Sequence, residues 1–349
     1  MPTVLPRSRP LTELHTHLGG AVAPAIMWGI AHAQGIRLPT KDYWEFRQLI
    51  TVSARRGRSF DGYLQLFHWT ELIQSSPIAV ERSVYEVIGG AYRKNNITTI
   101  ELRFNPHKRV RHGLHTMDAI ILAVMQGLER ASLHYGVATG IILSLGRDLS
   151  LESNWQIIDA AIKWRSRGSL NGANGVVGID MAGPESRGLE LSKPWLSEVT
   201  VMMEKAREAG LKITYHIGES EATGPEGMLR VIEAIHPDRI GHGIELRNAQ
   251  GRQKERLVKL LHEESICLEL CPTVNLVTRV IPDFPCIGRF VRDLAHHQIP
   301  YCINTDNPYL IHTNLKQEHE IIGKELGNDA DALLGLGMQH ALQHRFLND

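Results

Sequence analysis

The stretch LKITYHIGESEATGPEGMLRVIEAIHPDRIGHG, residues 211–243, holds two short apolar runs with an amphipathic segment between them. Its pattern predicts a strand over Leu211–Tyr215, a helix over Glu226–Ile235 and a second strand that ends at Arg239–Gly241. Two strands joined by a helix pair in parallel, because the helix carries the chain back to the edge where the first strand began. The stretch therefore predicts a βαβ unit.

The same alternation extends in both directions along the chain. Helical patterns cover Pro194–Ala209, which ends before Gly210, and then Arg252–Glu264 and Gly288–His297. The other expected strands are Leu11–Leu14, Thr98–Phe104, Val137–Leu145, Val176–Met181, Ile266–Leu270 and Pro300–Asn304. Eight parallel strands with helices between them close into a (β/α)₈ TIM barrel of the α/β class. The tail after about Asn314 is predicted to form closing helices.

A long segment, about residues 18–97, separates the first two strands and carries helical patterns. An insertion at this point of a barrel lies over the substrate-binding end, so we expect a helical lid and pocket wall within one domain spanning 1–349. A structural cap without substrate contact is the alternative. Phe60 and Trp69 are candidate pocket residues, although core packing is favoured for each one singly. The aromatic residues of the segment are Trp28, Trp44, Phe60, Tyr63, Phe67 and Trp69.

Composition excludes several classes of protein. Lys and Arg together number 38, as do Asp and Glu, so nothing indicates a nucleic-acid partner. The N-terminus lacks the apolar core of a secretory signal, and no apolar run reaches the roughly 18 residues of a membrane span. We therefore expect a cytoplasmic protein without a membrane partner. The four cysteines are predicted to be small buried hydrophobes rather than disulfides or zinc ligands, namely Cys267, Cys271, Cys286 and Cys302.

Several expected strands end in side chains that can ligate a metal. His15 and His17 are two apart, so both point to one side of a strand. His216 ends another strand, and His242, between two glycines, ends the next. Asp306 follows the last strand, where the alternative is a helix N-cap. Because the strand ends of a barrel meet at one face, these nitrogen and oxygen donors predict a zinc site.

Two absences in the sequence narrow this prediction. The strand ending at Ile179–Gly183 has no lysine to carry a bridging carbamate, which favours one zinc ion per chain over two. The combined H-x-E and P-C-x-x-C signature, in which zinc is held by His and Cys, is also absent.

At the level of motifs the sequence resembles the adenosine deaminase family of the amidohydrolase superfamily. The matching stretches follow the family's order and spacing from about residue 11 to 340. They are ELHTHLGG (13–20), ELRFNP (101–106), GIDMAGPE (178–185), HIGE (216–219), RIGHGIE (239–245), ELCPTVN (269–275) and NTDNP (304–308).

The resemblance implies a role for each matching residue. Glu219 would be the proton shuttle beside the purine N1, and His242 would orient the attacking water and help to deprotonate it. Gly183 would approach the ring with its backbone N–H. The implied zinc ligands are His15, His17, His216 and Asp306.

Two positions depart from the family pattern. Gly19 stands where the family usually has a carboxylate that contacts the 5′ side of the ribose, so it leaves room for a bulkier 5′ group. Asn307 replaces an Asp that faces the purine N7, and its amide can donate a hydrogen bond without first being protonated. Both changes bear on the choice of substrate more than on deamination.

The expected function is zinc-dependent hydrolytic deamination of adenosine or of an adenosine-like, 5′-modified nucleoside, with release of ammonia. Adenine or an N6-substituted purine is the alternative substrate. A cyclic-amide or dipeptide hydrolase, usually with two metals, and a non-catalytic ligand-binding barrel are less favoured. The expected partner is a small purine nucleoside or base, and the sequence does not predict an oligomeric state.

Overall fold

A computed structural model describes residues 9–52, 62–63, 65–111, 113–165 and 173–347. Eight strands form one sheet in which each strand pairs in parallel with the next, in the order β1 to β8. The predicted (β/α)₈ barrel is thus confirmed. The strands are β1 (Leu11–His17), β2 (Ile97–Phe104), β3 (Ala138–Gly146), β4 (Ala173–Ala182), β5 (Lys212–Ile217), β6 (Arg239–His242), β7 (Cys267–Leu270) and β8 (Tyr301–Ile303).

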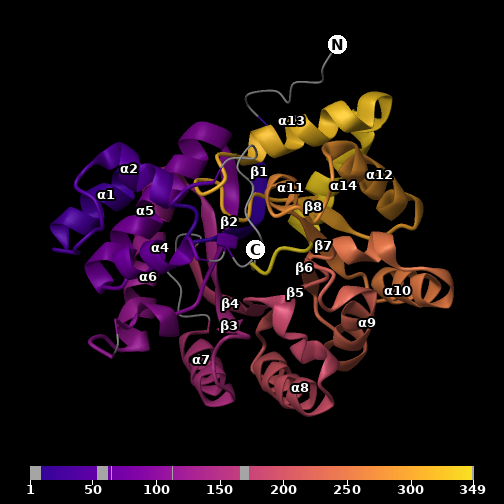
Figure 1. Cartoon of the computed structure of the whole chain (residues 1–349), viewed down its shortest axis with the longest axis horizontal. Helices are drawn as coiled ribbons and strands as arrows, with labels where there is room; N and C mark the ends of the chain where they lie inside the picture. The colour runs from indigo at the N-terminus through magenta and orange to yellow at the C-terminus, as the bar shows by residue number, and fades with distance from the viewer. Residues whose placement is uncertain (1–8, 53–61, 64, 112, 166–172, 348–349) are drawn as a thin grey trace.

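Helices surround the sheet on its outer side (Figure 1). Several begin at side chains that accept a backbone N–H bond, as Ser76, Thr116 and Asp283 do. The helices between and after the strands are α5 (Pro77–Asn95), α6 (Met117–Tyr135), α7 (Leu151–Trp164), α8 (Lys193–Glu208), α9 (Gly224–Ile235), α10 (Gly251–Glu263), α11 (Pro272–Val277), α12 (Phe284–His296), α13 (Leu315–Leu326) and α14 (Ala330–Gln343). Short 3₁₀ turns are η2 (His107–Arg109), η3 (Glu185–Arg187), η4 (Leu189–Leu191), η5 (Ile244–Asn248) and η6 (Gly327–Asp329).

The last strand returns to the first at the carboxyl ends of both. The backbone N–H of Asp306 donates to the carbonyl of His15 at 2.8 Å, and that of His17 donates to the carbonyl of Asp306 at 2.8 Å. These bonds form a parallel bridge between Thr16 and Asp306 just beyond β8. The end of the barrel where β1 and β8 meet is therefore the place where the predicted ligands come together.

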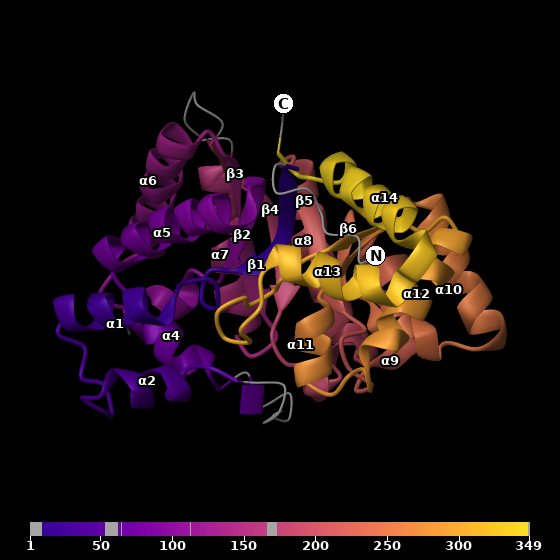
Figure 2. The same cartoon turned by 90° about the horizontal axis from the view of Figure 1, so that it is seen from above.

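The segment between β1 and β2 adds three helices before α5, namely α1 (Pro24–Ala33), α2 (Tyr43–Leu49) and α4 (Phe67–Ile73). Figure 2 shows them at the same end of the molecule as α11, which directly follows β7. Tyr63 and Leu66 belong to a small apolar cluster with Val274 and Leu310, which lie beyond β7 and β8. The segment thus packs on the loops at the carboxyl end of the barrel, while its action as a lid stays a prediction.

Several smaller expectations also meet the structure. Cys267, Cys271 and Cys302 are buried, whereas Cys286 is only partly buried. In the part of the chain that the structure describes, no helix combines the length and apolar character needed to cross a membrane. Trp69 packs against the main hydrophobic core, and Phe60 lies outside the described residues.

Candidate active site

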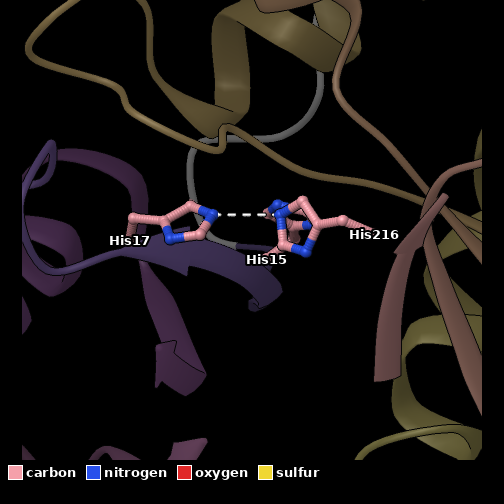
Figure 3. Close-up of side chains that lie close together, drawn as sticks. All are labelled: His15, His17 and His216. Carbon is pink, nitrogen blue, oxygen red and sulfur yellow. Dashed lines mark hydrogen bonds between the residues drawn. The ribbon is translucent and has the colours of Figure 1, made fainter. Parts of the chain in front are cut away.

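Three histidine rings meet at the carboxyl end of the barrel (Figure 3). His15 and His17 come from β1 with ring centroids 5.4 Å apart, and His216 from β5 lies 4.6 and 5.1 Å from them. One nitrogen of each ring lies within 4.8 Å of the others. The period of two along β1 brings both of its histidines to this point, as the sequence predicts.

Asp306 completes the cluster from the loop after β8. Its Oδ1 lies 3.4 Å from Nε2 of His17 and 3.8 Å from Nε2 of His15. Its φ of 59° is left-handed, which is uncommon for a residue other than glycine and is typical of backbone held in place at functional sites. No described helix begins at this residue, so the alternative of an N-cap is wrong.

Two carboxylates behind the cluster fix the orientation of its rings. Nδ1 of His15 lies 2.7 Å from Oε2 of Glu269, and Nδ1 of His216 lies 2.8 Å from Oδ1 of Asp180. An ionised carboxylate accepts, so each Nδ1 carries the hydrogen and each Nε2 turns a lone pair inward. Burial lowers the pKa of His15, His17 and His216 well below the usual value, which keeps the rings neutral.

The inward lone pairs fit a cation. The buried Nε2 of His15 has no hydrogen-bond partner within the described chain, and Nε2 of His216 lies 3.1 Å from Nε2 of His17. Burial raises the pKa of Asp306 to about 8, and a cation at this point would favour its ionised form instead. Three imidazoles and one carboxylate form a donor set that zinc accepts.

Glu219 and His242 lie beside the cluster, as the sequence predicts. Nε2 of His242 is 3.5 Å from Oε1 of Glu219, and ligand atoms of these two residues and Asp306 lie within 4.8 Å of one another. Burial raises the pKa of Glu219 well above the usual value, and the nearby Asp306 raises it further. Burial lowers the pKa of His242 to about 3. Burial therefore favours the protonated form of Glu219 and the neutral form of His242.

Two buried charged side chains, Glu185 and Arg147, hold the loops after β4 and β5 in place. Glu185 accepts from the backbone N–H of Glu219 at 3.3 Å and from that of Ser220 at 2.7 Å. Arg147 donates to the carbonyl oxygen of Gly183 at 2.9 Å and also to that of His216. The loop after β4 is thereby tied to the end of β5.

Two connected cavities open at the cluster. The smaller, about 50 Å³, is lined by Gly183, Glu219 and Asn307 among others. The larger, about 520 Å³, shares His17 and Gly183 with it and is lined by Gly19. A cavity of this size falls in the range of small-molecule sites. The two cavities have four lining residues in common, namely His17, Phe67, Ala182 and Gly183.

The two departures from the family motif have definite surroundings. The Nδ2 group of Asn307 donates to Oδ1 of Asp306 at 2.5 Å and to the hydroxyl of Tyr63 at 2.7 Å. A Cβ atom at Gly19 would lie 3.0 Å from the ring of Phe67. The space beside Gly19 is therefore partly filled by Phe67, and the larger cavity continues past that ring.

Some site residues escape prediction from the sequence. Asp180, Glu269 and Arg103 lie inside quoted motifs, yet nothing in the motifs assigns them a role. Arg103 contacts both carboxylates, with NH2 2.8 Å from Glu269 and NH1 3.5 Å from Asp180. The available signal was a charged residue within an apolar strand, which is rarely buried without a partner. Tyr63 and Phe67 of the inserted segment line the smaller cavity, and a role of this segment as the wall of a substrate pocket stays a prediction.

Comparison with known proteins agrees with this geometry. A family model described as adenosine deaminase matches residues 10–349. An adenosine deaminase of Clostridium perfringens (strain SM101 / Type A) is 30% identical over 323 residues, which cover 92% of this chain and 89% of that protein.

Solved structures share the fold. The adenine deaminase of Arthrobacter aurescens superposes with a TM-score of 0.81 at 20% identity, over 97% of this chain and 94% of that one. An amidohydrolase of Burkholderia ambifaria with bound Zn superposes with a TM-score of 0.81 at 21% identity, over 98% of this chain and 87% of that one. The Arabidopsis N6-mAMP deaminase superposes with a TM-score of 0.79 at 25% identity, over 98% of this chain and 95% of that one. Together with the matched family model, the curated relative shows that this chain belongs to the adenosine deaminase family, which comprises hydrolases acting on C–N bonds.

Proposed function

We propose that this protein hydrolyses the 6-amino group of adenosine, or of an adenosine-like nucleoside modified at the 5′ position, and releases ammonia. One observation carries the proposal. Oε1 of the buried Glu219 lies 3.5 Å from Nε2 of His242, beside three converging imidazoles, and burial raises the pKa of Glu219 well above its usual value. Such an arrangement can supply a proton to a ring nitrogen while water adds to the neighbouring carbon.

The metal that suits the donor set is one zinc ion per chain. His15, His17, His216 and Asp306 would hold it, since their donor atoms converge and the two rings on carboxylates present Nε2. A zinc ion at such a site lowers the pKa of a coordinated water from 15.7 to about 7 and so provides a nucleophile at neutral pH.

Glu219 would act as the proton donor. As oxygen adds to the carbon that carries the amine, negative charge builds up on N1 of the purine, and the Glu219 proton neutralises it. The ionised carboxylate then takes the proton of the hydroxyl group that has added to the ring and passes it to the amine, which leaves as ammonia as the C–N bond breaks and the C=O bond forms. The water proton accepted by His242 afterwards restores the protonated Glu219. Groups that transfer protons in this way contribute about 10²- to 10⁴-fold in rate.

His242 would orient the attacking water and accept its proton through Nε2. That role requires Nδ1 to carry the other hydrogen. Nδ1 lies 3.3 Å from the carboxamide of Asn275, whose buried Oδ1 has no partner within the described chain. A half-turn of that carboxamide presents Oδ1 to Nδ1 and leaves the Nε2 lone pair directed at the site.

Adenine and N6-substituted purines form the second group of candidate substrates. Two structural neighbours bear on them, since one is named an adenine deaminase and the other an N6-mAMP deaminase. The larger cavity favours a substrate that extends beyond the purine, because adenine alone would leave most of its 520 Å³ empty.

A screen for ammonia release from purine bases, nucleosides, 5′-modified nucleosides and N6-substituted purines tests the proposal. We expect turnover of a 6-aminopurine nucleoside, loss of activity on chelation, and recovery with one equivalent of zinc. Full activity in a rigorously metal-free preparation would contradict the zinc requirement. The absence of ammonia from every 6-aminopurine with the zinc-loaded protein would contradict the function itself.

A further inference from the structure

Four arginine side chains are almost completely buried, at 2% exposure or less: Arg103, Arg109, Arg147 and Arg239. Three of them are neutralised by buried carboxylates. Arg103 and Arg239 both pair with Glu269, at 2.8 and 2.6 Å. Arg147 pairs with Glu190 at 2.6 Å. A buried charge without such a partner carries a large desolvation cost, so pairing is the rule.

Arg109 is the exception among the four. Within the described chain it makes no ion pair, and its one hydrogen bond is a long one of 3.5 Å to the carbonyl of Gln74. Its Nε is buried without a partner. Burial lowers the pKa of Arg109 to about 10, which still leaves the guanidinium charged at neutral pH.

Arg109 lines the larger cavity, which connects with the catalytic cluster. It lies at the end of η2, directly after the loop that follows β2. Phe104, also on the wall, lies under the guanidinium with its ring centroid 5.7 Å away. The unpaired cation is therefore held against a site wall instead of in the protein core.

Among the described residues, the other charged and polar side chains that line the larger cavity near Arg109 do not accept a hydrogen bond from its guanidinium group. Lys108 is already paired with Asp148 at 2.7 Å. Glu71 lies near both cations without an ion pair to either within the described chain, and burial raises its pKa. Asn105 accepts from the backbone N–H of Lys108 through Oδ1, while its buried Nδ2 has no partner. Arg109 and Asn105 both line this cavity, and each has a buried donor, Nε and Nδ2 respectively, that lacks an acceptor within the described chain.

We propose that the larger cavity holds the part of the substrate farthest from its amino group, and that Arg109 and Asn105 bind an anionic oxygen group there, a carboxylate or a phosphate. The inference rests on the proposed function, because it assumes that the 6-amino edge of the purine lies at the cluster. Guanidinium groups suit both anions through paired N–H bonds, and bonds to charged groups are the stronger ones.

Matched pairs of nucleosides test this inference on the zinc-loaded protein. One arm compares 5′-(carboxyalkyl)thioadenosines of increasing chain length with the corresponding amides, and the other compares adenosine 5′-phosphate with 5′-methylthioadenosine. We expect kcat/KM for the anion to exceed that for its neutral partner by about 10-fold or more in one arm. That arm identifies the anion. If neutral nucleosides are deaminated and no anion is preferred in either arm, the inference is wrong while the proposed function stands.

Variants locate the effect. Arg109→Met should reduce the anion-to-neutral ratio of kcat/KM by about 10- to 100-fold, and Arg109→Lys, which keeps the charge, should retain part of it. Arg111→Met, two residues along and outside the cavity lining, should keep the full ratio. An unchanged ratio in folded Arg109→Met would overturn the assignment of Arg109. The comparison of substrates on the unmodified protein decides the preference even if that variant does not fold.

Discussion

At the scale of single residues, burial does most of the work of setting protonation states in the site. It raises the pKa of Glu219 well above its usual value and lowers that of His242 to about 3. The same burial keeps His15 and His216 neutral, while Glu269 and Asp180 decide which nitrogen faces inward. One physical cause thus acts on both the proposed proton donor and the proposed metal ligands.

Glu219→Gln is the sharpest test at this scale. Because burial favours the protonated carboxyl group, glutamine replaces it at nearly equal size and charge but cannot transfer a proton. We expect kcat to fall by about 10²- to 10⁴-fold with zinc content and purine binding retained, measured by steady-state kinetics, metal analysis and calorimetry. The exposed Glu221→Gln is the matched control and should keep normal turnover.

The dependence of activity on pH gives a second test of the role of Glu219. Since the pKa of Glu219 is raised, the protein loses its proton donor only as pH rises through that raised value. Activity should therefore decline on the alkaline side, and this limb should be absent from the residual activity of Glu219→Gln. Normal deamination by the variant would show that Glu219 is not the proton shuttle.

At the scale of elements, the strands were the most predictable part of the molecule. The runs Thr98–Phe104 and Ile266–Leu270 match β2 and β7 within one residue, because each is a short run of mainly apolar and β-branched residues even though charged residues interrupt it. Since barrel strands present their carboxyl ends at one face, the ligand positions followed from the strand count. Helix starts were less certain, as α12 begins at Phe284, four residues before the expected Gly288.

The hydrogen-bond partners of the site residues and the contacts of the pocket wall depend on residues that are far apart in the sequence. Asn307 donates to Tyr63 across 244 positions, and Arg103 reaches Glu269 across 166. No local periodicity encodes such pairs, so a single sequence gives their residue types without their partners. The partners behind the site and the individual contacts of the pocket wall could not be predicted for this reason, whereas the candidate ligands could.

The turn after β1 packs directly against the loop after β8, so a larger side chain in the turn should displace that loop. A Cβ atom at Gly20 would lie 2.5 Å from Cβ of Asn307, next to the proposed zinc ligand Asp306. Gly20→Ala should therefore displace the loop, lower zinc affinity and activity by at least about 10-fold, and cost about 1–3 kcal/mol of unfolding free energy. Chelator competition and denaturant titration measure the two effects.

Gly29→Ala provides the control for this variant. Gly29 lies within α1, and the nearest atom to its added Cβ is 3.9 Å away. Alanine there should keep activity and raise stability by up to about 1 kcal/mol, because glycine is a poor helix residue. Equal activity in both alanine variants would show that Gly20 does not hold the ligand loop in place.

At the scale of the whole molecule, stability depends on a balance between buried acids and buried imidazoles. Burial raises the pKa of Glu13 to about 8 and that of Glu318 to about 7. In the unfolded chain these carboxyls ionise near pH 4.5, so the folded state loses stability as pH rises from there through the raised values. Buried histidines with a lowered pKa have the opposite effect. The folded protein loses stability as pH falls below about 6.5, because the unfolded chain then binds protons at these histidines and the folded state does not.

His319 allows one term of this balance to be isolated far from the catalytic cluster. It is buried on α13, where Nδ1 lies 2.9 Å from the carbonyl oxygen of Leu315, and burial lowers its pKa to about 4. Between pH 7 and 5 the unfolded chain gains a proton at this histidine and the folded protein does not. This difference alone should lower the free energy of unfolding by about 2 kcal/mol over that interval.

His319→Leu removes the titrating group while keeping an apolar side chain of similar size in place. Denaturant titrations at pH 7 and 5 should therefore show a loss of stability on acidification that is smaller in the variant, by about 2 kcal/mol. His296→Gln, at an exposed position of α12, should retain the wild-type loss. If His319→Leu loses as much stability as the wild-type protein, His319 takes up its proton without unfolding, and α13 packs less tightly around it than its burial indicates.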